Sequence, residues 1–299
     1  MRLYKKGDKK LLNAWAFYDW ANSVYPLVIS TAIFPIYFKS ITKGEPVDFL
    51  WLNSIENDAF IGYVSSFTFI ILAVISPILS GIADHTGYKK LFMQIFCYIG
   101  AISCILLYTF DLDNFDLGMI YYFFAVVGFW GSLVFYNSYL PDIANVDEQD
   151  ITSAKGYSLG YLGSIILLIF CLLLTQFPDY FNIDGKTQAV KISFVLVGIW
   201  WLVFSQYSFY YLPGKSYYNI QKTNLYSSKT LLSGFNQLID VLNQLKSNKK
   251  LRVFLLSFFI FTIPTQTIIL LASYFGADLN EISWSNEETM QSGLIIAII

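Results

Sequence analysis

The hydrophobic positions of this chain gather into long runs that are separated by short polar connections. A helix needs about 20 apolar residues to cross a hydrocarbon core about 30 Å thick. Runs close to or above that length fall at residues 11–38, 60–82, 91–110, 117–140, 157–177, 192–212 and 253–277. The pattern therefore predicts an all-α polytopic membrane protein with about seven full transmembrane helices.

A further apolar run begins near Met290 and reaches Ile299 at about half the length of a span. We interpret this run as part of an eighth transmembrane helix. Because a natural chain rarely ends in the middle of a bilayer, we expect the sequence to be truncated on its C-terminal side.

The composition agrees with a membrane location. Hydrophobic residues make up 56% of the chain and charged residues 13%, and the mean hydropathy is +0.52. These values exclude a disordered tail, a nucleic-acid-binding protein and a disulfide-stapled secreted domain. His85 and the cysteines show no spacing typical of metal ligands, so we expect no metal and no cofactor. We interpret the aromatic residues, 19% of the chain, mainly as lipid-facing bulk and an interfacial belt.

The basic residues are sorted by loop and orient the chain. An N-terminus inside the cell places the basic residues of 2–10, 89–90, 155 and 215–252 in the cytoplasm. The remaining lysines would lie outside: Lys39, Lys43, Lys186 and Lys191. Cytoplasmic loops carry an excess of Lys and Arg, so we predict a cytoplasmic N-terminus.

The chain divides at Pro213–Gly214. Residues 1–212 are predicted to form a six-helix N-terminal bundle, residues 213–250 a cytoplasmic linker, and residues 251–299 the start of an incomplete second bundle. Apolar residues in the linker recur at helical spacing: Leu231, Phe235, Leu238, Leu242 and Leu245. This amphipathic helix can rest on the cytoplasmic leaflet or serve a regulatory role, and the pattern leaves both open.

Among the Asp, Glu, Lys, Arg and His residues, Asp19 alone falls inside a predicted span. An acid at mid-bilayer costs about 2.5–3.5 kcal/mol on insertion scales and therefore faces protein or water. Asn22 and Ser23 follow on the same helical face, and Pro26 should kink the helix one turn later. This stripe is a candidate solute or ion pathway, with Asp19 as a candidate proton carrier. Alternatively, Asp19 is structural and bonds Asn137 or a helix terminus.

A second proline lies among polar residues in the seventh predicted span. Pro264 should interrupt this helix, and Gln266 and Thr267 follow it. If the protein is built from two six-helix halves, this span corresponds to the first one. Breaks at corresponding positions in two halves are typical of a transporter's central site. We therefore add Gln266 and Thr267 to the candidate pathway.

Glycines recur along the fourth and fifth predicted spans. The fourth span carries Gly128 and Gly131, and the fifth carries Gly156, Gly160 and Gly163. Small residues at helical spacing let helices approach closely, so we interpret them as packing seams, with a binding role as the alternative.

The loop between the second and third spans has a more specific pattern. Asp84 closes one helix, Gly87 permits a tight turn, and Lys89 and Lys90 begin the next helix. This D-x-x-G-x-K-K pattern resembles the signature loop of the major facilitator superfamily. The resemblance implies that these residues belong to a cytoplasmic gate, in which the acid meets a helix terminus of the opposite half of the transporter.

Other segments resemble one branch of that superfamily. Residues 15–23 and 31–35 resemble the first helix of vacuolar amino-acid effluxer-like transporters and their bacterial relatives, and residues 136–144 and 156–163 are similar to the fourth and fifth helices. The resemblance implies alternating access between two six-helix bundles about a central site. It also implies a small polar solute such as an amino acid, protons as a candidate coupling ion, and a bacterial inner membrane.

We therefore interpret the chain as a secondary transporter, or a fragment of one, that binds membrane lipid and a small solute. The alternative is a non-transporting membrane scaffold or an inert fragment. An enzyme is not expected, because the spans contain no paired acids, histidine cluster or nucleophile–base set. We expect no nucleic acid and no obligate protein partner.

Overall fold

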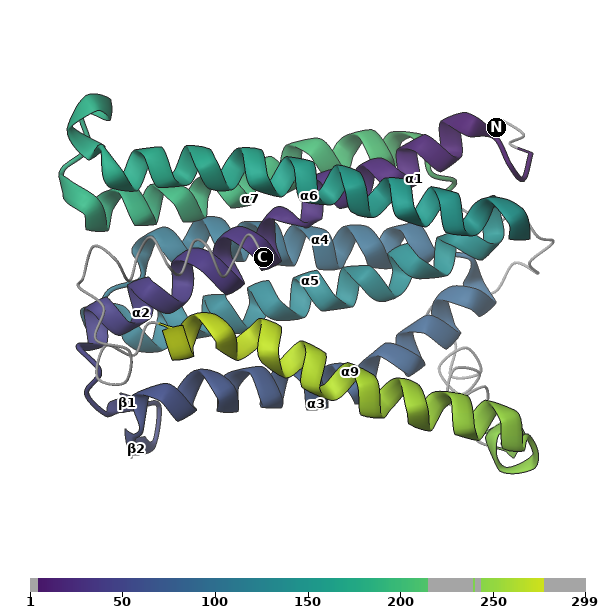
Figure 1. The fold of residues 1–299 in the computed structure, drawn as a ribbon, viewed down its shortest axis with the longest axis horizontal. Helices are drawn as coiled ribbons and strands as arrows, with labels where there is room; N and C mark the ends of the chain where they lie inside the picture. Colours follow the sequence, from purple (N-terminus) through teal and green to yellow (C-terminus); the bar gives the residue numbers. More distant parts are fainter. Residues whose placement is uncertain (1–4, 215–238, 240–242, 277–299) are drawn as a thin grey trace.

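The fold is a bundle of long helices that run side by side (Figure 1), in a computed structural model that describes residues 5–214, 239 and 243–276. Within these residues, 7 segments are long and apolar enough to cross a membrane. The prediction of an all-α polytopic membrane protein is therefore confirmed. The apolar run at residues 290–299 lies outside the described residues.

The first span consists of consecutive helical segments: α1 (Lys9–Asn22), η1 (Tyr25–Ile33) and α2 (Phe34–Thr42). The other spans are α3 (Asn57–Thr86), α4 (Lys89–Leu106), α5 (Phe115–Ile143), α6 (Val146–Gln176), α7 (Gly185–Tyr211) and α9 (Lys249–Gly276). A small antiparallel hairpin, β1 (Val47–Phe49) and β2 (Leu52–Ile55), joins α2 to α3. Short 3₁₀ turns complete other connections: η2 (Leu107–Thr109), η3 (Leu112–Asn114) and η4 (Pro178–Phe181).

The two prolines that were expected to break helices behave differently. Pro26 lies at the start of η1, which is a π-helix, so the predicted kink takes the form of a change in helical winding. Proline lacks the backbone N–H that would continue the α-helical pattern. In contrast, α9 continues as one α-helix through Pro264, so the helix is not interrupted there. The nearby hydroxyls of Thr265 and Thr267 bond carbonyls one turn back, which supports proline in membrane helices.

The helix α6 extends well beyond the apolar run that predicted it. Its first residues, 146–156, are mostly polar and were predicted as loop. The Glu148 carboxylate accepts hydrogen bonds from the backbone N–H of Asn145 at 3.0 Å and from its Nδ2 at 2.7 Å. This arrangement stabilises the start of the helix, because its first N–H groups have no partner within the helix itself.

Glycines bring α4 into backbone contact with both of its neighbours. A Cβ built on Gly128 of α5 would lie 2.4 Å from the Cα of Gly100, and one on Gly198 of α7 would lie 2.5 Å from the carbonyl oxygen of Ala101. Gly131 faces the ring of Phe96 in the same seam. The interpretation of Gly128 and Gly131 as a packing seam is therefore confirmed.

Aromatic side chains fill much of the interior of the bundle. Fully buried examples include Tyr18, Tyr25, Phe34, Tyr122 and Trp201, and the rings of Phe34 and Tyr122 stack with centroids 4.0 Å apart. The expectation that the aromatic residues serve mainly as lipid-facing bulk is wrong for this set. Helices in a membrane associate largely through close packing, which large rings supply.

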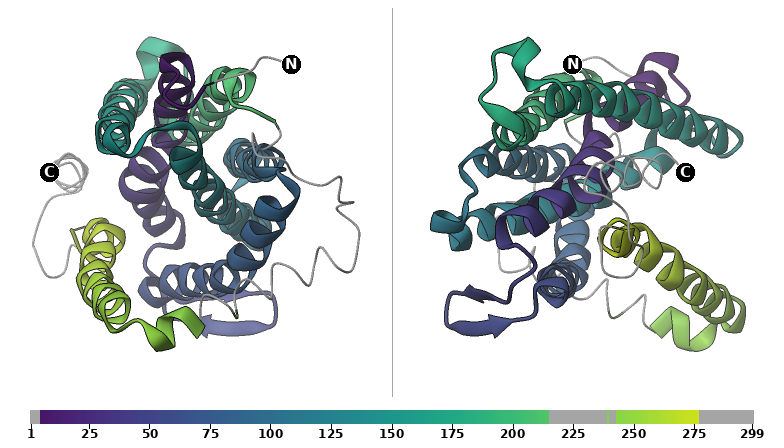
Figure 2. Two further views of the ribbon diagram at one scale, coloured as in Figure 1. Left: turned by 90° about the vertical axis from the view of Figure 1, so that its right-hand side faces the viewer. Right: turned by 60° about the vertical axis from the view of Figure 1, so that its left-hand side comes forward.

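The helix α9 lies at the edge of the bundle (Figure 2). It contacts η1 and α2, and most of its side chains between Leu251 and Ile268 are exposed. Most of the predicted amphipathic stripe of the linker, residues 231–242, lies outside the described residues.

Candidate functional site

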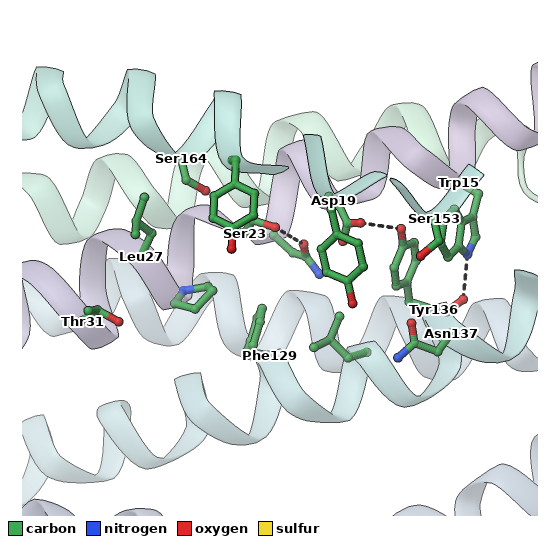
Figure 3. Close-up of a pocket in the computed structure, with 15 residues that line it drawn as sticks. Trp15, Asp19, Ser23, Leu27, Thr31, Phe129, Tyr136, Asn137, Ser153 and Ser164 are labelled. Carbon is green, nitrogen blue, oxygen red and sulfur yellow. Dashed lines mark hydrogen bonds between the residues drawn. The ribbon is translucent and has the colours of Figure 1, made fainter. Parts of the chain in front are cut away.

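A cavity of about 280 Å³ lies between the first span, α5 and α6. Figure 3 shows the side chains that line it, which come mainly from α1, η1, α5 and α6. The residues that line it are Trp15, Asp19, Asn22, Ser23, Pro26, Leu27, Thr31, Phe129, Leu133, Tyr136, Asn137, Ser153, Tyr157, Tyr161 and Ser164. The predicted polar stripe of the first span therefore faces an internal space.

Asp19 is held by Tyr136, which Trp15 positions in turn. Its side chain is buried, with the residue 7% exposed, and its Oδ2 accepts a hydrogen bond of 2.8 Å from the hydroxyl of Tyr136. The Tyr136 ring stacks on Trp15 with centroids 4.2 Å apart, and Trp15 Nε1 donates to the Tyr136 carbonyl at 2.8 Å. Ring stacking and two hydrogen bonds thus fix the position of the carboxyl relative to α5 (Figure 3).

Other polar residues that line the cavity have incomplete hydrogen bonding. Ser23 Oγ lies 3.4 Å from Asn22 Oδ1, which is a long contact. Asn22 Nδ2 and Ser164 Oγ are buried and have no hydrogen-bond partner among the described residues. Buried polar groups are usually paired, so unpaired ones beside a cavity indicate a place where a ligand or water binds. Asn137 lines the same cavity but does not bond Asp19 in this arrangement.

The glycines of α6 allow this helix to lie against the polar stripe. A Cβ on Gly156 would lie 2.6 Å from Asp19 Oδ2, and one on Gly160 would lie 2.5 Å from Ser23 Oγ. A Cβ on Gly163 would lie 3.0 Å from the carbonyl oxygen of Trp20. The seam is a packing seam, as interpreted from the sequence, and it also shapes the cavity wall at Asp19 and Ser23.

Two predicted pathway residues lie elsewhere. Gln266 and Thr267 are on α9, their side chains are exposed, and they do not line this cavity. Thr267 Oγ1 donates to the carbonyl of Ile263 in its own helix at 2.8 Å. The structure therefore brings Asp19, Asn22, Ser23 and Asn137 together and leaves these two residues apart from them.

The predicted gating loop forms a tight turn between α3 and α4. Gly87 ends α3 with φ of +74°, a conformation that favours glycine. Lys89 Nζ lies 2.8 Å from Asp142 Oδ2 at the end of α5, and Lys90 Nζ donates to the carbonyl of Leu212 after α7 at 3.0 Å. The lysines thus fasten this turn to the neighbouring helix ends. Asp84 belongs to α3, and its side chain lies outside the description.

Sequence reasoning missed the aromatic part of the site. Trp15 and Tyr136 position Asp19, and Tyr157 and Tyr161 line the cavity from α6. Part of this was detectable, because Trp15 precedes Asp19 by one helical turn and Tyr136 precedes Asn137 in the same motif. Among the described residues, no group of three or more His, Cys, Asp or Glu could hold a metal ion.

The described residues form a multi-pass helical bundle whose first span turns a polar stripe towards a cavity, which defines an all-α polytopic membrane protein with a cavity between its helices. Comparison with known proteins agrees with this class and gives the family. The chain belongs to the family described as "Vacuole effluxer Atg22 like", which matches residues 7–299.

Individual relatives support the same assignment. The chain is 30% identical over 268 residues to "Uncharacterized MFS-type transporter YxiO" of Bacillus subtilis, an alignment that covers 89% of this chain and 60% of the relative. It is 23% identical over 288 residues to "Autophagy-related protein 22" of Coccidioides immitis, covering 66% of this chain and 47% of the relative. The chain thus spans about half to three-fifths of the length of these relatives. No solved structure gives a significant match.

Proposed function

We propose that the protein is a secondary transporter that moves a small polar solute, with amino acids as the leading candidates, by alternating access. Residues 1–212 would form the first half, residues 213–250 the linker, and residues 251–299 the start of the second half. The observation that carries the proposal is the cavity in which Asp19, Asn22, Ser23 and Asn137 meet. A cavity between membrane-spanning helices that contains a few converging polar side chains is the arrangement that a solute pathway requires.

The sorting of basic residues supports a cytoplasmic N-terminus. The ends of the helices near the N-terminus then lie at the cytoplasmic face, including the α3–α4 turn with Lys89 and Lys90. We propose that this turn, with Asp84 and Gly87, is part of a cytoplasmic gate. The ion pair of Lys89 with Asp142 supports the proposal, because it couples the turn to the α5 helix that lines the cavity. We further propose a location in a bacterial plasma (inner) membrane, which the bacterial origin of one relative supports.

The proposal has further parts. Protons are the proposed coupling ion, with Asp19 as their carrier, because it is the sole Asp or Glu among the described residues that line the cavity. Gln266 and Thr267, which do not line this cavity, are proposed to face the part of the pathway that the second half contributes. The protein is proposed to be embedded in membrane lipid and to move its solute without catalysis and without an obligate protein partner.

Cysteine accessibility tests alternating access directly. The native thiols Cys97, Cys104 and Cys171 are all buried, so they give little background. Thr31→Cys and Asn137→Cys each place a thiol in the cavity wall. The reagent is a membrane-impermeant thiol label, applied to right-side-out and to inverted vesicles. In each conformation we expect it to reach the introduced thiol from one face of the membrane only. A transported solute should change the relative extent of labelling from the two faces.

A transport assay complements the labelling. Asp19→Asn should abolish solute accumulation, whereas Asp150→Asn, which neutralises an exposed acid on α6, should leave it unchanged. Simultaneous labelling from both faces, or full transport by the Asp19→Asn protein, would contradict the proposal.

A further inference from the structure

We propose that a second cavity, at the end of the bundle away from the N-terminus, holds an acyl chain of an anionic phospholipid, with Lys186 as the partner of the lipid phosphate. The second cavity has a volume of about 220 Å³ and lies between the first span, α6 and α7. No described residue lines both this cavity and the solute cavity. The lipid site is therefore separate from the proposed transport pathway.

The second cavity extends over the depth of one leaflet. Its wall follows the first span from Ala32 to Ser40, close to the end of α2 at Thr42, and includes the end of α6 and the first two turns of α7. These ends meet on the side of the bundle opposite the N-terminus (Figure 1). The stretch from Ala32 to Thr42 is about 15 Å long, which is half of a hydrocarbon core about 30 Å thick. A chain from one leaflet matches this depth.

The inner part of the second cavity is apolar. The side chains that line it there are Ala32, Ile33, Ile36, Leu172 and Val190. A polar solute would lose its hydration here without gaining hydrogen bonds in return. An acyl chain already lies in hydrocarbon and gains close contacts with this wall, so the lining favours a lipid chain.

The hydroxyl groups along the wall already donate within the protein. Tyr37 donates to the carbonyl of Phe110 at 2.6 Å, and Ser40 donates to the carbonyl of Tyr37 at 2.7 Å. Thr175 donates to a carbonyl of its own helix at 3.0 Å. The solute cavity differs, because buried polar atoms beside it have no partner among the described residues. The second cavity thus has no such demand for a polar occupant.

Lys186 supplies a cation at the mouth of the second cavity. Its side chain is exposed, and it has no hydrogen bond or ion pair within the described residues, whereas Lys191 of the same helix is paired with Asp111. Asp179 and Asp184 lie in the preceding connection but do not line the cavity. A lysine at this level attracts anionic lipid headgroups. A phospholipid whose chain fills the cavity therefore places its phosphate near the Lys186 ammonium group.

A matched set of ligands separates the chain, the phosphate and the headgroup charge. Dioleoyl phosphatidylglycerol carries all of these features, and dioleoyl phosphatidylcholine has the same chains with a zwitterionic headgroup. Dioleoylglycerol has the chains alone, and glycerol 3-phosphate has the phosphate alone. Each is titrated into the purified protein in detergent, and the Tm is measured. We expect phosphatidylglycerol to raise the Tm with saturation, phosphatidylcholine to need a several-fold higher concentration, and the other two to have no comparable effect.

A charge variant tests the headgroup contact. Lys186→Gln should weaken phosphatidylglycerol about fivefold, because a lysine near anionic lipid contributes about 1 kcal/mol and about 1.4 kcal/mol corresponds to tenfold. It should also remove the advantage of phosphatidylglycerol over phosphatidylcholine. Lys43→Gln is the matched control, since Lys43 is an exposed lysine just after α2 that does not line the cavity. It should leave both affinities unchanged.

A volume variant tests the chain contact. Val190→Trp places a large ring in the apolar part of the cavity and should abolish saturable stabilisation by phosphatidylglycerol. Val203→Trp is the matched control, because Val203 lies on the same helix and is 56% exposed. The ligand series on the wild-type protein and the exposed Lys186→Gln change keep the proposal testable even if Val190→Trp does not fold.

Other results would overturn the inference. Equal stabilisation by phosphatidylglycerol and phosphatidylcholine, or an unchanged preference in the Lys186→Gln protein, would exclude the headgroup contact. Unchanged phosphatidylglycerol binding in a folded Val190→Trp protein would show that the lipid acts elsewhere. Full stabilisation by glycerol 3-phosphate would assign the site to free phosphate, and no effect of any lipid would exclude a lipid occupant.

Discussion

Gly128→Ala tests whether backbone contact between α4 and α5 shapes the site. The added Cβ would lie 2.4 Å from both the Cα and the N of Gly100, and 2.7 Å from the carbonyl oxygen of Phe96. Carbon atoms in contact normally lie about 3.5–4.0 Å apart, so the helices would have to separate by about 1 Å. All three atoms belong to backbone, so no change of rotamer can relieve the clash.

The expected change in the free energy of unfolding is the sum of two opposing effects. Overpacking of this kind costs about 1–3 kcal/mol, and replacing a helical glycine by alanine returns up to about 1 kcal/mol. We therefore expect the free energy of unfolding to fall by about 1–2 kcal/mol, or the Tm to fall by several degrees, at about 2–4 °C per kcal/mol. The readout is thermal unfolding in detergent, followed by circular dichroism.

Gly62→Ala is the matched control. Gly62 is also helical, in α3, but a Cβ there would meet nothing within 4 Å. The same substitution should therefore leave the Tm unchanged or raise it slightly. If Gly128→Ala unfolds at or above the wild-type temperature while Gly62→Ala behaves as expected, α4 and α5 do not meet at backbone distance.

Two further predictions concern the connection between α3 and α4 and the start of α6. A double-mutant cycle with Lys89→Met and Asp142→Asn should give a coupling free energy of about 0.5–1 kcal/mol in thermal or chemical unfolding. We expect a value in this range because the two side chains are only 13% and 33% exposed. Additive effects of the two substitutions would show that the ion pair is not formed. Glu148→Ala should lower the free energy of unfolding by about 0.5–1.5 kcal/mol, because it removes the acceptor for the Asn145 N–H groups, and an unchanged Tm would contradict this role.

Much of the bundle could be predicted from residue patterns alone because the bilayer fixes the length of a span. The polar stripe of Asp19, Asn22 and Ser23 was likewise predictable, since the spacing of three and four residues places side chains on one helical face. The segments missed were those where hydropathy and helix formation disagree. The start of α6 is polar yet helical, and its signal is the Asn145–Glu148 pair rather than apolar periodicity.

The partners of the stripe could not be predicted in the same way. The hydrogen bond from Tyr136 to Asp19 joins residues 117 positions apart, and the bond from Trp15 to the Tyr136 carbonyl joins residues 121 apart. Such contacts depend on how α1 and α5 cross, which local spacing does not determine. The π-helical winding of η1 was also beyond prediction, since proline alone indicates a break but not its form.

The energetics of Asp19 distinguish a structural acid from a functional one. An acid inside a membrane span costs about 2.5–3.5 kcal/mol. The described contacts give its carboxyl one hydrogen bond, from Tyr136, and a hydrogen bond to a charged group returns only about 1.5–3 kcal/mol. Contacts within the described structure thus at best balance the cost of the acid, so a neutral residue of the same shape should serve the fold equally well or better.

Asp19→Asn should therefore leave the Tm unchanged or raise it while abolishing solute binding and transport. Asparagine retains an oxygen that can accept from the Tyr136 hydroxyl, so the packing of α1 on α5 should be preserved. Such a gain in stability with a loss of activity is typical of residues retained for function. A marked fall in Tm, together with normal transport by the protein that remains folded, would instead show that Asp19 serves the fold and that the cavity binds its solute by other groups.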